Sequence, residues 1–506
     1  MVSEWDVVIV GGGAAGCVLA SRLSERANLS VVLLEAGPDL RSSMPDDVRD
    51  GKRPTFSHDW GYVSEPNSEG PNSEGPNSKG PNSEGPVLAL YRGKLLGGCS
   101  STNATFALRG HPTDYDAWAA AGNAGWSFAE VLPYFCKLET DADLGSADWH
   151  GSNGPLPIRR YGDRELTDVA LAGLETLEES GFPLIADANE PGAVGLACIP
   201  VNARDGERIS TALAYLPLGQ GRSNLTIRCE AEVAELILDG GRVAGVRLLS
   251  GEEIRAHEVI VSAGAYASPA LLMRSGIGPS AALRELDIPV IADLPGVGQN
   301  LIDHPAVSVD LLYDRVVEPV PVFQVAATFH SSGTGSSVAP DLHCMVGGPY
   351  EGDPATFFLA TALLKPHSRG SVTLRSADPT APPRIDLGYY RASDDLDRLV
   401  EGVLRVREVG RVGAIKELSG GVEFGPGAEV DLRAWVRRRT WTYHHPVGTC
   451  AMGIDPSAGA VVDPACRVHG IAGLRVVDAS IMPDIPSANT HIPTVMIAER
   501  VAALIN

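Results

Sequence analysis

The sequence predicts an α/β fold in two parts, a first domain on a largely parallel sheet and a second domain of α+β type. The chain opens with a buried strand, Trp5–Val10, a glycine-rich turn and a helix, Ala14–Leu23. A second buried strand follows at Ser30–Leu34, which completes a βαβ unit. A late strand, Leu474–Asp478, returns to this pattern after a long stretch of mixed strands and helices. The first domain is therefore expected to be discontinuous in sequence.

Size and charge narrow the class of protein. The chain has 506 residues, 44% of them hydrophobic and 21% charged, which fits two or three folded lobes of roughly 100–200 residues each. Its 41 basic and 63 acidic residues give a net charge of −22. This charge argues against nucleic acid or a membrane surface as a partner, because both attract basic proteins.

Targeting signals and cysteine pairs are not found in the sequence. Glu4 and Asp6 stand where a secretion signal has basic residues, and no apolar run approaches the roughly 20 residues of a membrane span. We therefore expect a cytoplasmic protein. The eight cysteines are scattered and form no CxxC pair, so we expect free thiols and no metal site.

The order of predicted strands and helices along the chain defines the expected domain boundaries. Beyond the opening unit, strands are expected at 225–228, 233–238, 243–249, 258–262, 340–346, 356–364 and 370–374. Helices are expected at 270–275, 393–412 and 493–504. We assign to the first domain the ranges 1–155, 223–309 and 445–506, and to the second, substrate-facing domain the ranges 156–222 and 310–444.

Residues 66–85 repeat the sequence Pro-Asn-Ser-Glu-Gly with small changes. These residues favour turns, and nothing apolar is available for burial. We interpret the repeat as a flexible, solvent-exposed insertion. A lid or an oligomer contact is the alternative.

The first turn carries a dinucleotide-binding pattern. Gly11, Gly13 and Gly16 form G-x-G-x-x-G between strand and helix, where glycine permits the tight turn, the approach of a diphosphate and close packing. The diphosphate lies against the amides at the start of the helix. Glu35, at the end of the second strand, can accept hydrogen bonds from ribose hydroxyls. The pattern predicts a Rossmann-type unit but does not separate FAD from NAD.

Five further segments resemble the glucose–methanol–choline (GMC) oxidoreductases. These segments are 92–103, 264–269 with 275–279, 296–304, 445–450, and 478–480 continuing through 489–494. The resemblance extends from residue 5 to residue 505. It implies an FAD-binding Rossmann-type domain, discontinuous in sequence, beside a β-sheet substrate-binding domain.

The resemblance also implies which residues hold FAD. Near the ADP half these are Gly11, Gly13, Ala14, Ala15, Gly16, Glu35 and Ala36, with Val233 reaching the adenine through its backbone. Near the flavin and its linker they are Gly97, Gly98, Asn103, Ala104, Asp478, Ala479, His491 and Thr494. Some relatives bond the flavin covalently to a histidine where this chain has Thr102, so the resemblance implies noncovalent FAD here.

The implied reaction is the oxidation of an alcohol to an aldehyde or ketone. His445 is the implied base for the hydroxyl proton, and His491 its partner on the substrate oxygen. The hydride goes to flavin N5, and O2 or another acceptor reoxidises the flavin. The positive end of the helix expected at 493–504 could face the negative charge of reduced flavin.

The other histidines are given structural roles. His304, His343 and His469 are expected to find ordinary hydrogen-bond partners. The role of His444 stays open, and shaping the pocket is one interpretation of it. A metal site at His444, His445 and His491 is set aside, because no carboxylate or cysteine completes it.

Two other function classes remain as alternatives. A hydroxynitrile lyase would use the same site without net redox chemistry, and a non-catalytic flavin-binding protein would not need His445 and His491. Relatives of similar length with noncovalent flavin suggest a small hydroxymethyl compound, such as hydroxymethylfurfural or pyridoxine, as substrate. The sequence leaves open the substrate, the electron acceptor and the oligomeric state.

Overall fold

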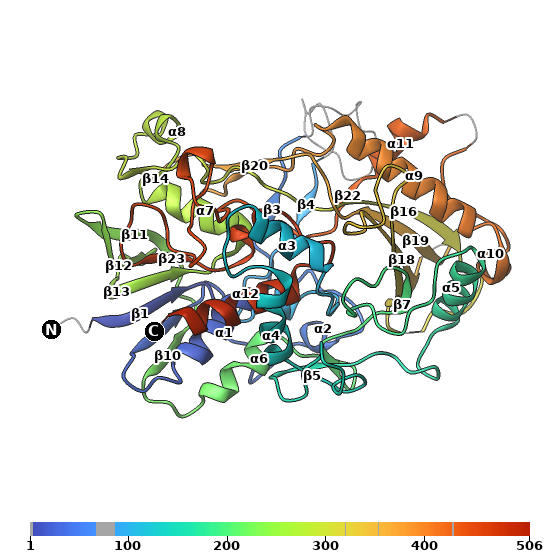
Figure 1. Cartoon of the computed structure of the whole chain (residues 1–506), viewed down its shortest axis with the longest axis horizontal. Helices are drawn as coiled ribbons and strands as arrows, with labels where there is room; N and C mark the ends of the chain where they lie inside the picture. Colours follow the sequence, from blue (N-terminus) through green and yellow to red (C-terminus); the bar gives the residue numbers. More distant parts are fainter. Residues whose placement is uncertain (1–3, 67–86, 319, 353, 428–429, 506) are drawn as a thin grey trace.

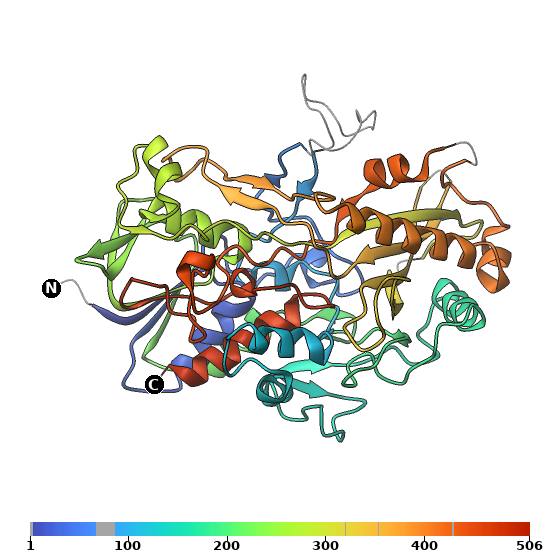
Figure 2. The same ribbon diagram turned by 45° about the horizontal axis from the view of Figure 1, so that its top comes forward.

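The computed structural model describes residues 4–66, 87–318, 320–352, 354–427 and 430–505. The repeat therefore lies outside the described residues from 67 onward. Two large sheets occupy opposite ends of the molecule, and both chain termini lie at the end of the first sheet (Figures 1 and 2). Within the described ranges, no helix has both the length and the apolar character needed to cross a membrane.

The first sheet has seven strands and a parallel centre. Its order is β10 (Leu225–Arg228), β2 (Val31–Leu34), β1 (Trp5–Val10), β13 (Glu253–Val261), β12 (Arg242–Leu248) and β11 (Val233–Asp239), and β23 (Leu474–Val476) also pairs with β13. The pairs among β10, β2, β1, β13 and β23 are parallel, whereas β11, β12 and β13 pair antiparallel. The apolar runs of β1 and β2 are nearly continuous because the centre of a parallel sheet is covered on both faces.

The return of β23 to the first sheet confirms the discontinuous first domain. β23 pairs with β13, with Ile260 opposite Arg475. The helix after it, α12 (His491–Leu504), packs against α1 (Ala14–Leu23) and α4 (Phe128–Leu138). Arg22 of α1 binds the fully buried Glu499 of α12 at 2.8 Å, so the first and last helices of the domain are joined by an ion pair.

The second sheet has six strands, all antiparallel. Its order is β22 (Trp441–Thr442), β16 (Pro305–Leu312), β19 (Thr356–Leu363), β18 (Leu342–Tyr350), β17 (Phe323–Phe329) and β7 (Leu196–Cys198). β16 crosses the expected boundary at 309/310, so the later part of the second sheet begins at Pro305 and not after 309. On one face it packs against α5 (Asp168–Glu179) and α9 (Ser393–Val409).

The other face of the second sheet carries small side chains. Ala306 pairs with Ala362, which in turn pairs with His343, and these three lie on the same face. Ala326 pairs with Met345 in the neighbouring row. This face packs against segments of the first domain through Phe106, Leu108 and Ala488. The junction between the domains is therefore lined on one side by alanine.

Shorter elements complete the chain. The remaining helices are α2 (Asp46–Arg49), α3 (Pro112–Ala120), α6 (Thr211–Ala214), α7 (Gly264–Arg274), α8 (Ser280–Glu285), α10 (Gly413–Ser419) and α11 (Leu432–Arg439), with 3-10 turns η1 (Gly98–Ser101), η2 (Leu216–Gly219), η3 (Pro456–Ala458) and η4 (Ala479–Ile481). The small strands are β3 (Tyr62–Val63), β4 (Ala89–Leu90), β5 (Glu139–Asp141), β6 (Leu156–Ile158), β8 (Ala203–Arg204), β9 (Glu207–Arg208), β14 (Ile277–Gly278), β15 (Ala292–Asp293), β20 (Ser371–Thr373) and β21 (Arg384–Asp386).

Three helix boundaries differ from those expected. α7 begins at Gly264 and not at 270, because the distant Asp478 carboxylate accepts the Gly264 amide and so caps the helix. α12 begins at His491 and not at 493, since proline in the first helical turn leaves no hydrogen bond unmade. The helix expected at 393–412 ends at Val409, and the separate helix α10 follows it.

Candidate active site

In the glycine-rich turn between β1 and α1, Gly11 and Gly16 are tightly packed, whereas the space next to Gly13 is open. Gly11 has φ +98°, and a Cβ there would lie 2.5 Å from the carbonyl oxygen of Ser262. A Cβ on Gly16 would lie 1.9 Å from the carbonyl oxygen of Gly11, so only glycine permits this packing. A Cβ on Gly13 would meet nothing within 4 Å. This shape fits a diphosphate that lies over the turn.

The first amides of α1 face the same space. Gly13 is the N-cap of α1, and no side chain caps the helix there. The amides of Ala14 and Ala15 therefore stand at a helix N-terminus without a side-chain acceptor, which is a suitable site for an anion.

Glu35 is fixed beside this turn by backbone amides. Its two carboxylate oxygens accept hydrogen bonds from Gly12 and from Gly37, each at 2.8 Å, and Ala36 lies between Glu35 and Gly37. Burial raises the pKa of Glu35 to about 7, against the effect of these amides. Each oxygen keeps a further lone pair for a ribose hydroxyl.

Val233 lies close to the same place. The carbonyl oxygen of Glu35 accepts the amide of Ala231 at 2.8 Å, and β11 begins shortly after, at Val233. The start of β11 is therefore held next to the end of β2. This position is compatible with a backbone contact to adenine.

A second glycine segment contacts the first one. The amide of Gly97 donates to the carbonyl oxygen of Gly12 at 2.7 Å. A Cβ on Gly98 would lie 2.8 Å from the Cα of Gly13. Two segments far apart in sequence are therefore in direct contact at the start of α1.

The residues after this segment are held by backbone contacts. The side chain of Asn103 accepts the amide of Thr105 at 3.0 Å, and its carbonyl oxygen accepts Nε of Arg208 at 2.9 Å. Ala104 packs with the small-residue face of the second sheet. Asn103 and Ala104 therefore lie at the junction of the two domains, where the flavin is expected.

The carboxylate of Asp478 binds the protein itself. Oδ2 accepts the amide of Gly264 at 2.8 Å and the hydroxyl of Ser268 at 2.6 Å, and Oδ1 accepts the amide of Ser480 at 2.8 Å. Its backbone and that of Ala479 are thereby fixed at the start of η4. Any contact of Asp478 with the cofactor linker is expected to involve its backbone, because its side chain is already bonded.

His445 lies in a turn that Asp303 holds in place. One carboxylate oxygen of Asp303 accepts the backbone amides of His445 and His304, both at 2.8 Å. The other accepts the hydroxyl of Thr442. Burial raises the pKa of Asp303, while these donors act against the shift.

Both ring nitrogens of His445 have partners. Nδ1 lies 3.0 Å from Nδ1 of His304, and Nε2 lies 3.1 Å from Nδ2 of Asn489. The ring of Tyr443 lies 4.3 Å from the His445 ring. Burial holds the pKa of His445 well below its ordinary value, and the neighbouring His304 and Arg92 lower it further. At neutral pH His445 is therefore an uncharged imidazole.

The structure places Asn489 against His445. The predicted role of His491 concerns the substrate oxygen, so it stays a prediction. His491 is the first residue of α12, and burial lowers its pKa to about 4. Asn489 belonged to a motif that the sequence analysis quoted, but nothing in the local sequence shows that its amide faces His445. Thr494, a turn after His491, binds the carbonyl oxygen of Thr490 at 2.7 Å.

Buried polar atoms without partners mark the same place. Nδ1 of His444, Oδ1 of Asn489 and Nε2 of His491 have no hydrogen-bond partner among the residues that the structure describes. Such atoms are rare in folded proteins unless a ligand or water satisfies them. Together with the open space at Gly13, they fit a polar cofactor and a substrate.

His444 adopts an uncommon backbone conformation. Its φ is +65°, which costs about 1 kcal/mol or more in a residue other than glycine. The hydroxyl of Thr442 accepts its amide at 3.0 Å, and Arg92 donates to its carbonyl oxygen at 2.8 Å. Its ring lies 5.6 Å from that of Tyr91. This bend turns the chain so that the next residue, His445, faces Asn489.

A cavity next to Ala488 has small aliphatic walls together with the polar residues His111, Glu190 and Thr328. Leu108, Ile199, Ala326 and Ala488 line it, and His343 lies in its wall, with Tyr443 Oη 3.5 Å from its Nδ1. Burial lowers the pKa of His343 to about 4, so this ring is neutral. Lysine, arginine, phenylalanine, tyrosine and tryptophan are missing from the described lining.

Comparison with known proteins decides the family. Models of the GMC oxidoreductase family match residues 5–306 and residues 366–498. The chain belongs to the GMC oxidoreductases. It is an oxidoreductase of GMC type that acts on alcohols, and the family implies FAD as cofactor.

Relatives of this GMC oxidoreductase act on several alcohols. It is 37% identical to the 5-(hydroxymethyl)furfural oxidase of Methylovorus sp. (strain MP688), over 98% of each chain. It is 36% identical to an oxygen-dependent choline dehydrogenase of Burkholderia ambifaria, over 99% of this chain and 93% of the relative. The crystal structure of pyridoxine 4-oxidase from Mesorbium loti superposes with a TM-score of 0.89 at 31% identity, over 99% of both chains.

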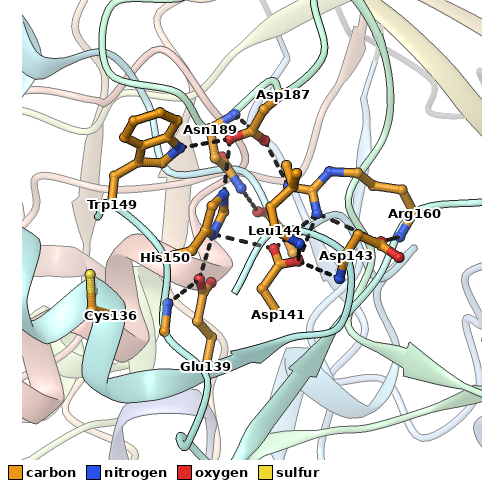
Figure 3. Close-up of polar contacts among 12 residues, drawn as sticks. Cys136, Glu139, Asp141, Asp143, Leu144, Trp149, His150, Arg160, Asp187 and Asn189 are labelled. Atoms are coloured by element: carbon orange, nitrogen blue, oxygen red, sulfur yellow. Dashed lines mark hydrogen bonds and ion pairs between the residues drawn. The ribbon is translucent and has the colours of Figure 1, made fainter. Parts of the chain in front are cut away.

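A second polar cluster in this GMC oxidoreductase lies away from His445. His150 donates to Glu139 at 2.7 Å through Nδ1 and to Asp187 at 2.9 Å through Nε2, and Arg160 binds Asp187 and Asp141 (Figure 3). The grouping of Glu139, Asp141 and His150 has the geometry of metal ligands. Arg109 binds Glu139, and Arg160 binds Asp141 and Asp187, so these carboxylates are already paired with guanidinium groups. We therefore interpret the cluster as a buried ion network.

Proposed function

We propose that this GMC oxidoreductase oxidises a small uncharged hydroxymethyl compound to the aldehyde, with His445 as general base. One observation carries the proposal: His445 is a buried, neutral imidazole whose Nε2 accepts a hydrogen bond from Asn489 at 3.1 Å. A general base has to be unprotonated at the working pH and within reach of the hydroxyl proton. His445 meets the first condition, and the unpartnered polar atoms around it support the second.

His445, Asn489 and His491 have different roles in the removal of the hydroxyl proton. The hydroxyl proton passes to Nε2 of His445, and Asn489 turns its amide from that nitrogen to the substrate oxygen. His491, neutral and with a free Nε2, holds the same oxygen from the start of α12. FAD, when bound, supplies the acceptor for the hydride that leaves the hydroxyl-bearing carbon.

The cavity next to Ala488 supports a substrate that carries no carboxylate. A carboxylate substrate would need a cation in the wall, and the described lining has no lysine or arginine. Glu190 is the one acidic residue of the described lining, and no phenylalanine, tyrosine or tryptophan is present there to hold a quaternary ammonium group. Two relatives, named for oxidation of hydroxymethylfurfural and pyridoxine, support the same class of compound.

We further propose that the FAD is bound noncovalently. Thr102 stands where some relatives carry the histidine that bonds the flavin, and its hydroxyl cannot replace an imidazole nitrogen. Acid precipitation of the purified protein should leave the yellow flavin in the supernatant. Flavin that stays with the pellet would contradict the proposal.

Anaerobic mixing tests the reaction. Uncharged hydroxymethyl compounds should bleach the flavin absorbance near about 450 nm, and the variant His445→Ala should bleach at least about 10²-fold more slowly. Readmission of air with release of hydrogen peroxide would identify O2 as the electron acceptor. Bleaching by none of a broad alcohol panel would overturn the proposal, and cyanide release from mandelonitrile without bleaching would favour a lyase.

A further inference from the structure

We infer that His304 determines which ring nitrogen of His445 carries the proton, and thereby acts as a positioning residue for the base. This inference rests on the proposed role of His445. The sequence analysis gave His304 an ordinary structural role, and the fold places it against His445 across 141 positions of the chain.

The two imidazole rings meet through the same kind of nitrogen. Nδ1 of His304 and Nδ1 of His445 are 3.0 Å apart, and the ring planes are inclined by 87°. Both side chains are buried. At this distance one nitrogen donates a proton and the other accepts it with its lone pair.

The contact with Asn489 indicates the direction of this hydrogen bond. Its Nδ2 can only donate, so Nε2 of His445 is the acceptor and carries the lone pair. The single proton of a neutral His445 is then on Nδ1, which donates to His304. His304 accepts with its Nδ1 and carries its own proton on Nε2, which has no hydrogen-bond partner among the residues that the structure describes. The lone pair of His445 is thus kept on the nitrogen that has to take the substrate proton.

The surroundings keep both rings neutral. Burial, together with His304, Arg92, His444 and His343, lowers the pKa of His445. Burial and Lys365 lower the pKa of His304 to about 3. The acidic groups nearby, Asp303 and Asp484, are already bonded, Asp303 to Thr442 and Asp484 to Lys365 at 2.7 Å. At neutral pH neither ring therefore carries a second proton, and one proton lies between the two Nδ1 atoms.

The contact acts during the proton step as well. When Nε2 of His445 takes the hydroxyl proton, the ring becomes a cation whose Nδ1–H is still bonded to His304. Neutral His304 stabilises the His445 cation through this hydrogen bond. A carboxylate in its place would also raise the pKa of His445 in the resting enzyme. Without an acceptor, the ring proton of resting His445 is free to move to Nε2 and block the base.

Two variants of His304 separate this role from packing. His304→Asn keeps an oxygen acceptor near the position of Nδ1, whereas His304→Leu keeps the bulk and removes the acceptor. His469 serves as control, because its ring bonds the carbonyl oxygen of Gly453 at 2.9 Å, away from His445. His469→Leu should leave every readout unchanged.

The decisive measurement is the tautomer of His445 in the oxidised holoenzyme. In 15N-histidine-labelled protein, NMR correlation of ring nitrogens with ring protons should show His445 as the Nδ1–H form, assigned by its loss in His445→Ala. The same form should persist in His304→Asn and give way to the Nε2–H form in His304→Leu. An Nε2–H form of His445 in the wild type would overturn the inference.

Rates provide the second readout. The limiting rate of anaerobic flavin reduction should fall on the order of 10²-fold in His304→Leu and less than about tenfold in His304→Asn, with KM little changed. Equal rates in all three proteins would also overturn the inference, while leaving the proposed function intact. If the wild type oxidises no alcohol, the proposed function fails, and the tautomer still decides the inference.

Discussion

The carboxylate of Asp303 accepts the backbone amide of His445 at 2.8 Å, although 142 positions of sequence separate the two residues. The same oxygen accepts the amide of His304. One side chain thereby places both members of the histidine pair, so the geometry of the base depends on a residue that need not touch the substrate.

Replacing Asp303 tests this placement. Asp303→Ala leaves two buried amides without an acceptor, at a cost of about 1–3 kcal/mol each, and should lower the turnover rate by about tenfold or more. Asp303→Asn keeps an oxygen for both amides and should retain most activity. Thermal unfolding and steady-state kinetics of both variants check this, and equal losses in the two would contradict it.

The two glycines of the first turn should differ in what they support. Gly16→Ala drives a Cβ into the Gly11 carbonyl oxygen, so we expect destabilisation by about 1–3 kcal/mol or more. Gly13→Ala points its Cβ into open space and should fold normally but bind FAD at least about tenfold more weakly. Thermal unfolding of the flavin-free protein and flavin fluorescence titration distinguish the two effects. Normal FAD affinity in Gly13→Ala would contradict a diphosphate at this turn.

The two histidines of the site should also differ. His445→Ala removes the base and should cost about 10²–10⁴-fold in kcat/KM. His491→Asn keeps a donor for the substrate oxygen and should cost far less, whereas His491→Ala should fall between them. Stopped-flow flavin reduction with each variant measures the order, and a fully active His445→Ala would refute the role of the base.

Substrate charge should matter in a defined direction. The described cavity lining has no phenylalanine, tyrosine or tryptophan to hold a quaternary ammonium group. We therefore expect kcat/KM for hydroxymethylfurfural to exceed that for choline by more than about tenfold. Preference for choline under the same conditions would show that the substrate lies elsewhere.

The buried network around His150 should make stability depend on pH. Burial lowers the pKa of His150, but the hydrogen bonds of Asp187 and Glu139 prevail and raise it above the ordinary value. A raised pKa means that the charged ring stabilises the fold fully below about pH 6.5, and that this is lost as the pH rises through the folded value.

The comparison of His150→Gln with the wild type measures this contribution. Losing the charged ring should cost about 1–3 kcal/mol at pH 6, and the difference in thermal midpoint should shrink as the pH rises. His257→Gln, at an exposed position, is the matched control and should show no such trend. A constant difference at all pH values would mean that His150 contributes only through packing.

Local pattern was sufficient for part of the fold. The bounds of β1 and α1 follow from an apolar run, a glycine turn and a helix of small residues, and the structure confirms them. The start of α7 could not be found in this way, because its cap, Asp478, lies just after β23, more than two hundred residues later in the sequence. The sequence predicts the first sheet well where strands that pair are also consecutive in sequence.

The candidate site could also be predicted only in part from the sequence. The motifs identified His445, but its partners Asn489 and His304 follow from how three distant segments fold together. A sequence pattern states which residue types are present, whereas the hydrogen bonds of a buried ring depend on orientation. For that reason the sequence analysis did not identify Asn489 as a contact of the base, whereas the role of His491 on the substrate oxygen stays a prediction.

The alanine face of the second sheet and the catalytic base belong to different elements of the fold. Ala306, Ala360 and Ala362 contribute one methyl group each to the floor at the domain junction, and they belong to β16 and β19, whereas the base belongs to the turn after β22. Ala326 of the same face also lines the cavity, and a larger side chain there would reduce the cavity volume while the turn that carries His445 keeps its geometry. A lineage, or an engineer, could therefore exchange one alcohol for another by single substitutions that leave the reaction itself unaltered.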